Sequence, residues 1–338
     1  MGKHTNKATL AGLVIALGII YGDIGTSPLY VFSEIIADRS ITEDLIIGSL
    51  SCIIWTITLQ TTIKYVILVL QADNKGEGGI FALYALVRRR RKWLVIPAMI
   101  GGAALLADGM ITPPITITSA IEGLQRLPAF HNLDEYIIYI VIGILSFFFF
   151  LQQFGTASIG RFFGPLMTIW FSMLAVFGVI HLFDDLSILR AFNPYYAIKL
   201  LSVNPQALWI LGAVFLCTTG AEALYSDLGH CGRENIRVSW IFVKSCLLLN
   251  YLGQGASLLS HHLNVPAGSH APINPFFDLM PDWFVLPGVI IATVAAIIAS
   301  QAMISGSFTL IGEAIRLNLW PRLKIRYPSE EKGQLFIP

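Results

Sequence analysis

The stretch YGDIGTSPLY, residues 21–30, decides the fold because it places polar and helix-breaking residues inside an apolar run that opens at Ala8. Pro28 has no N–H to donate to the carbonyl of Ile24, and its ring clashes with that carbonyl. We therefore predict a short unwound patch around Asp23, where free carbonyls lie beside a carboxylate and two hydroxyls. A proline kink in which Asp23 only caps a half-helix is the alternative.

The composition indicates that this stretch lies in a membrane. The chain has 338 residues, of which 55% are apolar and 13% are charged, whereas about 25% is ordinary for a soluble domain. The mean hydropathy is +0.69. Because a soluble protein of this size would still need a charged surface, we infer that much of the outside faces lipid. The net charge of +1 gives no reason to expect nucleic acid as a partner.

Eight segments are long and apolar enough to cross a bilayer, which takes about 20 residues of helix. We predict an all-α integral membrane protein with a single transmembrane domain over residues 1–338 and no cleaved signal peptide. The approximate limits of the spans are 8–36, 45–71, 93–121, 136–158, 162–182, 205–230, 238–261 and 283–311.

Lysine and arginine residues predict the orientation of these spans. With the N-terminus in the cytoplasm, the inside segments carry 16 of these residues and the outside loops carry 4. The run RRRRK at 88–92 then lies in a cytoplasmic loop, which explains it better than a nucleic-acid site does. We expect a multi-pass protein of the cell inner (plasma) membrane with a cytoplasmic N-terminus.

The remaining reactive residues form no pattern typical of an enzyme. No P-loop, GxSxG or HExxH motif is present, so we expect neither catalysis nor a cofactor. The three histidines His261, His262 and His270 are a weak metal signal, and we interpret them as part of a solvated outside loop. The four cysteines form no CxxC pair, and we interpret them as reduced thiols: Cys52, Cys217, Cys231 and Cys246.

The third span also carries a buried acid. In DGMITPPIT, residues 108–116, Asp108, Thr112 and Thr116 are spaced i, i+4 and i+8, so they share one helix face. The two prolines of the motif leave two carbonyls without helical donors. Glu122 follows near the outer end of the span, where it can be a functional acid or a charge at the interface.

The sixth span carries the third acid, in CTTGAEALYSD at 217–227. Gly220 should break this apolar helix, and Glu222 stands one turn after Thr219. An acidic residue at mid-membrane costs roughly 2.5–3.5 kcal/mol on insertion scales. Three such residues on separate spans therefore predict one shared polar site. Breaks in the first and sixth spans are also typical of inverted-repeat transporters that bind substrate between half-helices.

Several motifs together resemble the Kup-type (KUP/HAK/KT) potassium uptake transporters. They are GDIGTSPLY, KGEGGIFALYAL at 75–86, ADGMITPPITITSAIEGL at 107–124, TTGAEALYSDLGHCG at 218–232 and PRLKI at 321–325. The resemblance implies the LeuT-like inverted repeat of the amino acid–polyamine–cation superfamily, with broken helices 1 and 6. It also implies potassium uptake coupled to proton entry, with K⁺ and H⁺ as substrates.

The resemblance also implies a set of site residues. Family members are usually longer, with about twelve spans, so we expect the second repeat to be incomplete in this chain, which ends at GQLFIP. The expected K⁺-binding residues are Asp23, Tyr30, Asp108, Thr112, Thr116, Thr219 and Glu222, and the candidates for proton coupling are Asp23, Asp108, Glu122 and Glu222.

The sequence leaves two alternatives to potassium transport. An amino-acid transporter of the same fold would have to bind a substrate carboxylate beside three acidic side chains. An inactive truncated membrane protein would retain the fold without transport. As partners we expect the lipid bilayer, K⁺ and H⁺, with a homodimer as a further expectation and no nucleic acid.

Overall fold

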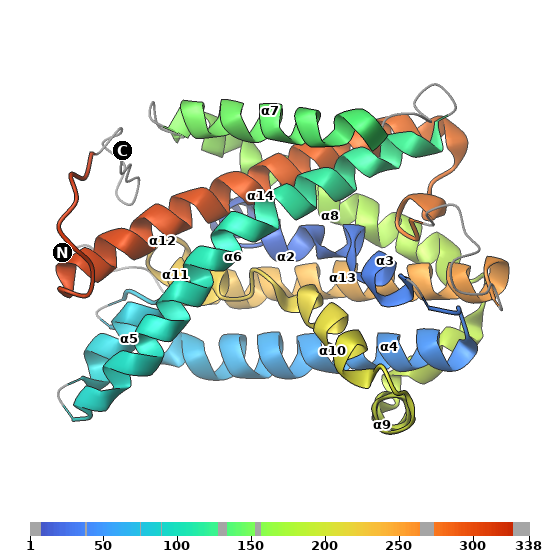
Figure 1. The fold of residues 1–338 in the computed structure, drawn as a ribbon, viewed down its shortest axis with the longest axis horizontal. Coiled ribbons are helices and arrows are strands. Elements are labelled where there is room, and N and C mark those ends of the chain that lie inside the picture. Colours follow the sequence, from blue (N-terminus) through green and yellow to red (C-terminus); the bar gives the residue numbers. More distant parts are fainter. Residues whose placement is uncertain are drawn as a thin grey trace.

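A computed structural model describes residues 8–37, 39–74, 76–88, 90–127, 134–152, 157–263 and 274–326. Within these ranges every regular element is a helix, apart from an isolated bridge between Asn74 and Glu77 (Figure 1). Helices satisfy their own backbone hydrogen bonds, as a segment in lipid must. The predicted all-α class is confirmed.

The first five expected spans appear as helices of unequal length. The first is divided into α1 (Leu10–Ile19), α2 (Gly22–Thr26), the 3₁₀ turn η1 (Ser27–Leu29) and α3 (Val31–Ile36). The others are α4 (Glu43–Thr56) with the π-helix η2 (Ile57–Leu68) and η3 (Val69–Gln71), α6 (Val95–Glu122) between η4 (Lys92–Leu94) and η5 (Gly123–Arg126), α7 (Asp134–Gln152), and α8 (Ala157–Leu182). The short α5 (Ile80–Val87) precedes α6.

The last three expected spans follow a connection made of η7 (Leu186–Phe192) and α9 (Pro194–Val203). The sixth is divided into α10 (Ala207–Phe215), η8 (Leu216–Thr218), α11 (Ala223–Ser226) and α12 (Leu228–Cys231). The seventh is α13 (Arg233–His261), and the eighth is α14 (Asp282–Arg316) after η9 (Phe277–Leu279).

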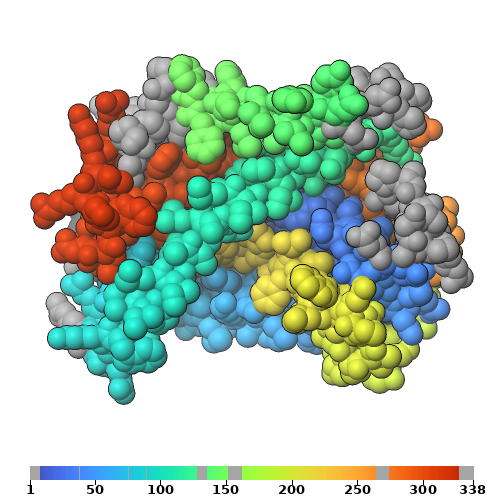
Figure 2. Space-filling view, in the orientation of Figure 1, coloured from blue at the N-terminus to red at the C-terminus, as the bar shows by residue number. Residues whose placement is uncertain are grey.

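Six of these helical segments are long and apolar enough to cross a membrane, and the bent pair formed by α1 and α2–η1 would be a seventh. The fourth expected span, 136–158, corresponds within the described ranges to a shorter apolar helix at Glu135–Phe150. Large apolar side chains of α6 and α7 are exposed, and both helices lie on the face of the molecule that Figure 2 shows. Met110 and Tyr139, for example, are 76% and 72% exposed, as expected for a surface in contact with lipid.

The short helix α2 lies inside the bundle. All five of its residues are buried, and α14 packs against it (Figure 1). Two pairs of long helices, α8 with α13 and α6 with α14, make up much of the surrounding structure. The middle of the broken first span, α2, is therefore held between long helices rather than exposed to lipid.

The two ends of the bundle carry different elements. The short helices α5 and α12 lie toward one end, on the left in Figure 1, and α3 and α9 lie toward the other. Arg88, Arg90 and Arg91 after α5 and Arg233 at the start of α13 belong to the first end. The positive residues on and near α9, Arg190 and Lys199, belong to the second end, where they pair with Glu43 and Asp44.

Candidate cation site

The first span bends before the stretch that the sequence predicts to unwind. The helix axis turns by 70° between α1 and α2–η1, at Ile20 and Tyr21. The prediction of an unwound patch across Gly22–Pro28 is therefore wrong in its position. Proline at position 28 removes only one donor, so the amide of Gly25 still bonds to the Tyr21 carbonyl at 3.0 Å and α2 forms.

The bend is fixed by contacts with α13. The Tyr21 hydroxyl donates to the carbonyl of Ile236 at 2.7 Å and accepts from Ser239 at 3.1 Å. After α2 the chain tightens into η1, with Pro28 near its start, and the amide of Tyr30 bonds to the Ser27 carbonyl at 3.2 Å. The chain thus contains one helical turn between two irregular points, and Asp23 lies in the first turn of that helix.

The sixth span is interrupted where Gly220 predicts a break. Gly220 has a φ of +83°, and the chain turns between η8 and α11. A β-carbon at this position would lie 2.7 Å from the β-carbon of Asp23. Glycine is needed both for the backbone conformation and for this close approach. The broken first and sixth spans therefore touch each other.

Three carboxylates meet at this contact. Asp23 of α2, Asp108 of α6 and Glu222 before α11 each bring an oxygen within 4.8 Å of the others. In the described part of the chain they are the only three acidic, histidine or cysteine side chains that are grouped closely enough to hold a metal ion together. Asp23 is 4% exposed, and neither of its carboxylate oxygens has a hydrogen-bond partner among the residues that the structure describes.

Hydroxyl groups extend the site along α6, which continues without a break through Pro113 and Pro114. Thr112 donates to an Asp108 carboxylate oxygen at 2.8 Å. Thr116, one turn further, donates to the Thr112 carbonyl at 2.9 Å, so its oxygen keeps only its acceptor capacity. The predicted face of Asp108, Thr112 and Thr116 is present, and Thr112 is the member that contacts a carboxylate.

The other predicted residues lie at different distances from the carboxylates. The Tyr30 hydroxyl lies 3.4 Å from that of Ser27, in the turn η1 that follows α2. Thr219 directly follows η8 as its C-cap and lies three residues before Glu222. Glu122 is separate, because it ends α6 14 residues after Asp108, about 21 Å along the helix.

The electrostatics of the three carboxylates require a cation or protons. Two unit negative charges at 4.8 Å repel each other by about 3 kcal/mol at an effective dielectric constant of 20. The buried Asp23 adds the cost of desolvation without a hydrogen bond to offset it. A monovalent cation between the three groups, or a proton on one of them, removes most of this repulsion. The arrangement can therefore bind cations and exchange protons.

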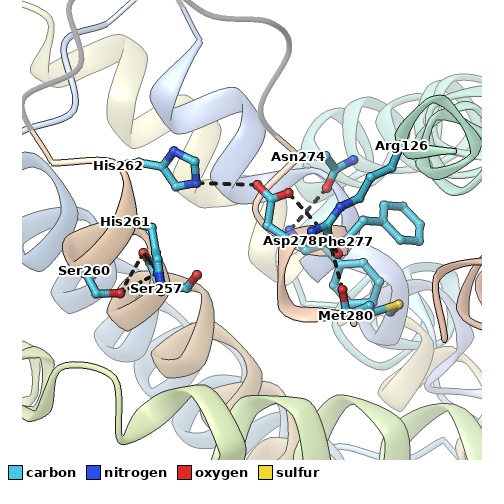
Figure 3. A network of polar contacts seen from close by, with 10 residues as sticks. Arg126, Ser257, Ser260, His261, His262, Asn274, Phe277, Asp278 and Met280 are labelled. Carbon is cyan, nitrogen blue, oxygen red and sulfur yellow. Dashed lines mark hydrogen bonds and ion pairs between the residues drawn. The ribbon is translucent and has the colours of Figure 1, made fainter. Parts of the chain in front are cut away.

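The histidines and cysteines that the sequence singles out form no shared site among the described residues. His262 lies 3.9 Å from Asp278, and His261 contacts Ser260 rather than a metal-like cluster (Figure 3). His270 lies outside the described residues. All four cysteines are buried and free, which confirms that they are reduced thiols.

Sequence reasoning missed several polar residues that contact the broken first span. Trp170 of α8 and Gln254 of α13 donate to its carbonyls, and Asn250 holds Gln254. The i, i+4 spacing of Asn250 and Gln254 within an apolar helix was a signal that could have pointed to a buried polar face. Nothing in the local sequence distinguishes Trp170 from a core tryptophan.

Comparison with known proteins gives the family. The model of the K⁺ potassium transporter integral membrane domain matches residues 10–338. The chain belongs to the Kup family of potassium transporters. A probable potassium transport system protein Kup of Cytophaga hutchinsonii is 62% identical over 337 residues, which are 98% of this chain and 50% of that protein.

Other Kup relatives match to the same extent. The proteins of Flavobacterium johnsoniae and Clostridium perfringens, each named a probable potassium transport system protein Kup, are 58% and 59% identical. The matches cover 99% and 98% of this chain and 52% and 51% of those proteins. The chain thus spans about half the length of the curated relatives it matches. No solved structure matches it.

Proposed function

We propose that this chain forms the ion-binding core of a secondary active potassium transporter that imports K⁺ together with H⁺. The observation that carries the proposal is the meeting of the Asp23, Asp108 and Glu222 carboxylates within 4.8 Å, at the contact between two broken spans. The names of the Kup relatives support potassium as the substrate.

The chemistry of the site suits potassium. K⁺ is large and weakly hydrated, so it exchanges water for carbonyl and hydroxyl oxygens with little loss, and selectivity depends on the number and field of those oxygens. Thr112, Thr116, Thr219 and Tyr30 would add neutral oxygens to the charged ones. The carboxylates would compensate the charge of the ion.

Proton coupling follows from the crowding of the acids. When the K⁺ ion leaves, the three carboxylates repel each other, and a proton on Asp23, Asp108 or Glu222 relieves the repulsion. Binding of the next K⁺ favours the ionised form again. Glu122, which is far along α6, would act as a separate proton station nearer the membrane surface.

The proposed fold is the LeuT-like inverted repeat, with spans 1–3 related to spans 6–8 and the second repeat incomplete in this chain. Its support is the pair of broken helices in contact, since half-helices meeting at the substrate site are typical of this fold. We further propose a single domain of eight crossings, in the plasma membrane, with a cytoplasmic N-terminus and lipid around the outward apolar faces.

Transport of an amino acid by the same fold is less well supported. Such carriers direct half-helix N-termini at a substrate carboxylate. Here Asp23 lies at the start of α2, so this position would repel that carboxylate.

Uptake into proteoliposomes tests the function. The complete gene product should accumulate ⁸⁶Rb⁺ when an inward proton gradient is imposed, and unlabelled K⁺ should compete. Collapse of the gradient with a protonophore should stop the accumulation. Uptake of labelled amino acids without ⁸⁶Rb⁺ uptake would contradict the proposal, as would ⁸⁶Rb⁺ uptake that is indifferent to the gradient.

A further inference from the structure

Two neighbouring helices each donate an N–H to a carbonyl of the broken first span. The indole Nε1 of Trp170 on α8 donates to the Gly25 carbonyl at 2.9 Å. The side-chain amide of Gln254 on α13 donates to the Pro28 carbonyl at 3.0 Å. Both bonds are buried, and they hold the chain two and five residues after Asp23.

The orientation of the Gln254 amide is determined by its surroundings. The Asn250 amide nitrogen donates to the Leu174 carbonyl at 3.2 Å, so the Asn250 oxygen faces Gln254. The nitrogen of Gln254 therefore faces two acceptors, this oxygen at 2.7 Å and the Pro28 carbonyl. A flipped amide would place oxygen against oxygen at both contacts. Gln254 is fully buried and acts as a donor to the broken span.

Trp170 is held in an equally fixed position. Its ring is fully buried and packs against Phe276 with 5.6 Å between the ring centroids. The segment that follows Phe276 is held by hydrogen bonds and an ion pair from two other helical segments. Arg126 donates to the carbonyls of Phe277 and Met280 and pairs with Asp278 (Figure 3), and His181 contacts the Leu279 carbonyl at 2.9 Å.

These bonds matter because α2 cannot set its own orientation. It has only five residues and no side-chain cap, and Gly22 and Gly25 leave its backbone loosely restrained. A shift by one residue would rotate the Asp23 side chain by about 100° around the helix axis, away from Asp108 and Glu222. Fixing two carbonyls further along the segment prevents that rotation.

We propose that Trp170 and Gln254 are positioning residues for the cation site, because they hold the broken first span so that Asp23 faces the other two carboxylates. The inference rests on the proposed function. Without these donors the segment would spend part of its time in orientations that do not bind the cation. The apparent dissociation constant for the cation is then the intrinsic one divided by the fraction of protein in the binding orientation.

Two substitutions with matched controls test the inference. Gln254→Met and Trp170→Phe remove the donors and retain much of the side-chain volume. Gln71→Met and Trp55→Phe remove similar bonds elsewhere, since Gln71 donates to the Ile67 carbonyl and Trp55 to the Phe192 carbonyl. In the complete gene product, ⁸⁶Rb⁺ uptake is measured across a range of Rb⁺ concentrations, and protection against thermal unfolding is measured as K⁺ is added.

The two donor variants should raise the half-saturating concentration of Rb⁺ by about three- to tenfold, as expected for one lost buried hydrogen bond. Maximal uptake per correctly inserted protein should stay within about twofold of the parent. The controls should leave both values unchanged. A purely structural role gives the opposite pattern, because misfolding lowers the number of active carriers and leaves the half-saturating concentration alone.

Half-saturating concentrations equal to those of the controls would overturn the inference. If Gln254→Met does not accumulate in the membrane, Trp170→Phe decides the question alone. Asn250→Leu should produce a smaller shift in the same direction, and its effect should be less than additive with that of Gln254→Met. A parent protein that shows no dependence on K⁺ or Rb⁺ would refute the proposed function instead, so the two failures are distinguishable.

Discussion

Asp23 combines three properties that seldom occur together at one residue. It is acidic, it is 4% exposed, and its two oxygens have no hydrogen-bond partner among the described residues. If its role were only to cap α2, its oxygens would be expected to accept from the N–H groups of the first turn. The helix has no such side-chain cap. The capping alternative therefore loses its main support, and an ion or proton becomes the better partner for this carboxylate.

Replacing Asp23 by asparagine tests this role most directly. Asp23→Asn keeps the shape of the side chain and removes the negative charge that would attract the cation. We expect uptake at low potassium to fall about 100-fold or more. The measurement is growth of a potassium-uptake-deficient strain at low potassium, with the amount of protein in the membrane as the control. Normal growth would mean that the buried acid is structural.

Thr112 should have a different effect because it is neutral. Thr112→Val removes an oxygen ligand and the bond to Asp108, and it removes no charge. We expect the half-saturating potassium concentration to rise by about three- to tenfold, with little change in maximal uptake. Thr168→Val is a matched control, since the Thr168 hydroxyl donates to the Gly164 carbonyl of its own helix. An equal effect of the two variants would contradict the ligand role of Thr112.

At the scale of elements, the two breaks differ in how well the sequence predicts them. Gly220 needs a positive φ and has no room for a β-carbon, so the residue type itself marks the break in the sixth span. The bend at Tyr21 depends on contacts with Ile236 and Ser239, more than 200 positions away in the chain. Local sequence cannot show such contacts, which is why the predicted unwound patch is misplaced.

The site residues also divide into those that the sequence predicts and those that it does not. The helical spacing of Asp108, Thr112 and Thr116 predicts their common face, and the motifs predict that Asp23 and Glu222 join them. The acidic pattern alone does not separate Glu122 from the others, because only the length of an uninterrupted α6 places it about 21 Å away. Of the two donors, Gln254 on α13 is signalled in the sequence only by its i, i+4 spacing with Asn250, and nothing local signals Trp170 on α8.

The turn η9 gives a prediction about pH. Burial raises the pKa of Asp278 above its usual value of 3.8, although Arg126, His262 and His261 act in the opposite direction. Because the pKa of Asp278 is higher in the folded than in the unfolded state, this group contributes to the stability of the folded protein below about pH 3.8. That contribution is lost as the pH rises through the folded-state pKa. Asp278→Asn should therefore be at least as stable as the parent at neutral pH, and the two should converge in acid.

The Asp278→Asn variant removes the carboxylate that pairs with Arg126. Arg126 still donates to the carbonyls of Phe277 and Met280, so its guanidinium is not left without a partner. Thermal unfolding of the purified protein between about pH 3.5 and 8 would measure the difference. A variant that is less stable than the parent at neutral pH, with a gap that closes in acid, would show that the ion pair outweighs the cost of burial.

The whole molecule is organised around a polar centre with an apolar exterior. The carboxylates lie where α2, α6 and the start of α11 meet, and the long helices around them present apolar side chains outward. The arginines near α5 and at the start of α13 lie at one end of the bundle, and the pairs made by Arg190 and Lys199 lie at the other (Figure 1). We expect the end that carries the arginines to be the cytoplasmic one.

Topology reporters test this arrangement across the membrane. We expect reporters fused after Arg91 and after Arg322 to be cytoplasmic and one at Ser269 to be external, because the inside segments carry 16 lysines and arginines and the outside loops carry 4. Ser269 lies outside the described residues, so Asn204, which directly follows α9, provides a second external position.

Alkaline phosphatase and green fluorescent protein fusions at the same sites control for expression. A cytoplasmic signal at Ser269 or at Asn204 would exclude the eight-crossing arrangement, because each position lies in a loop that this arrangement places outside the cell.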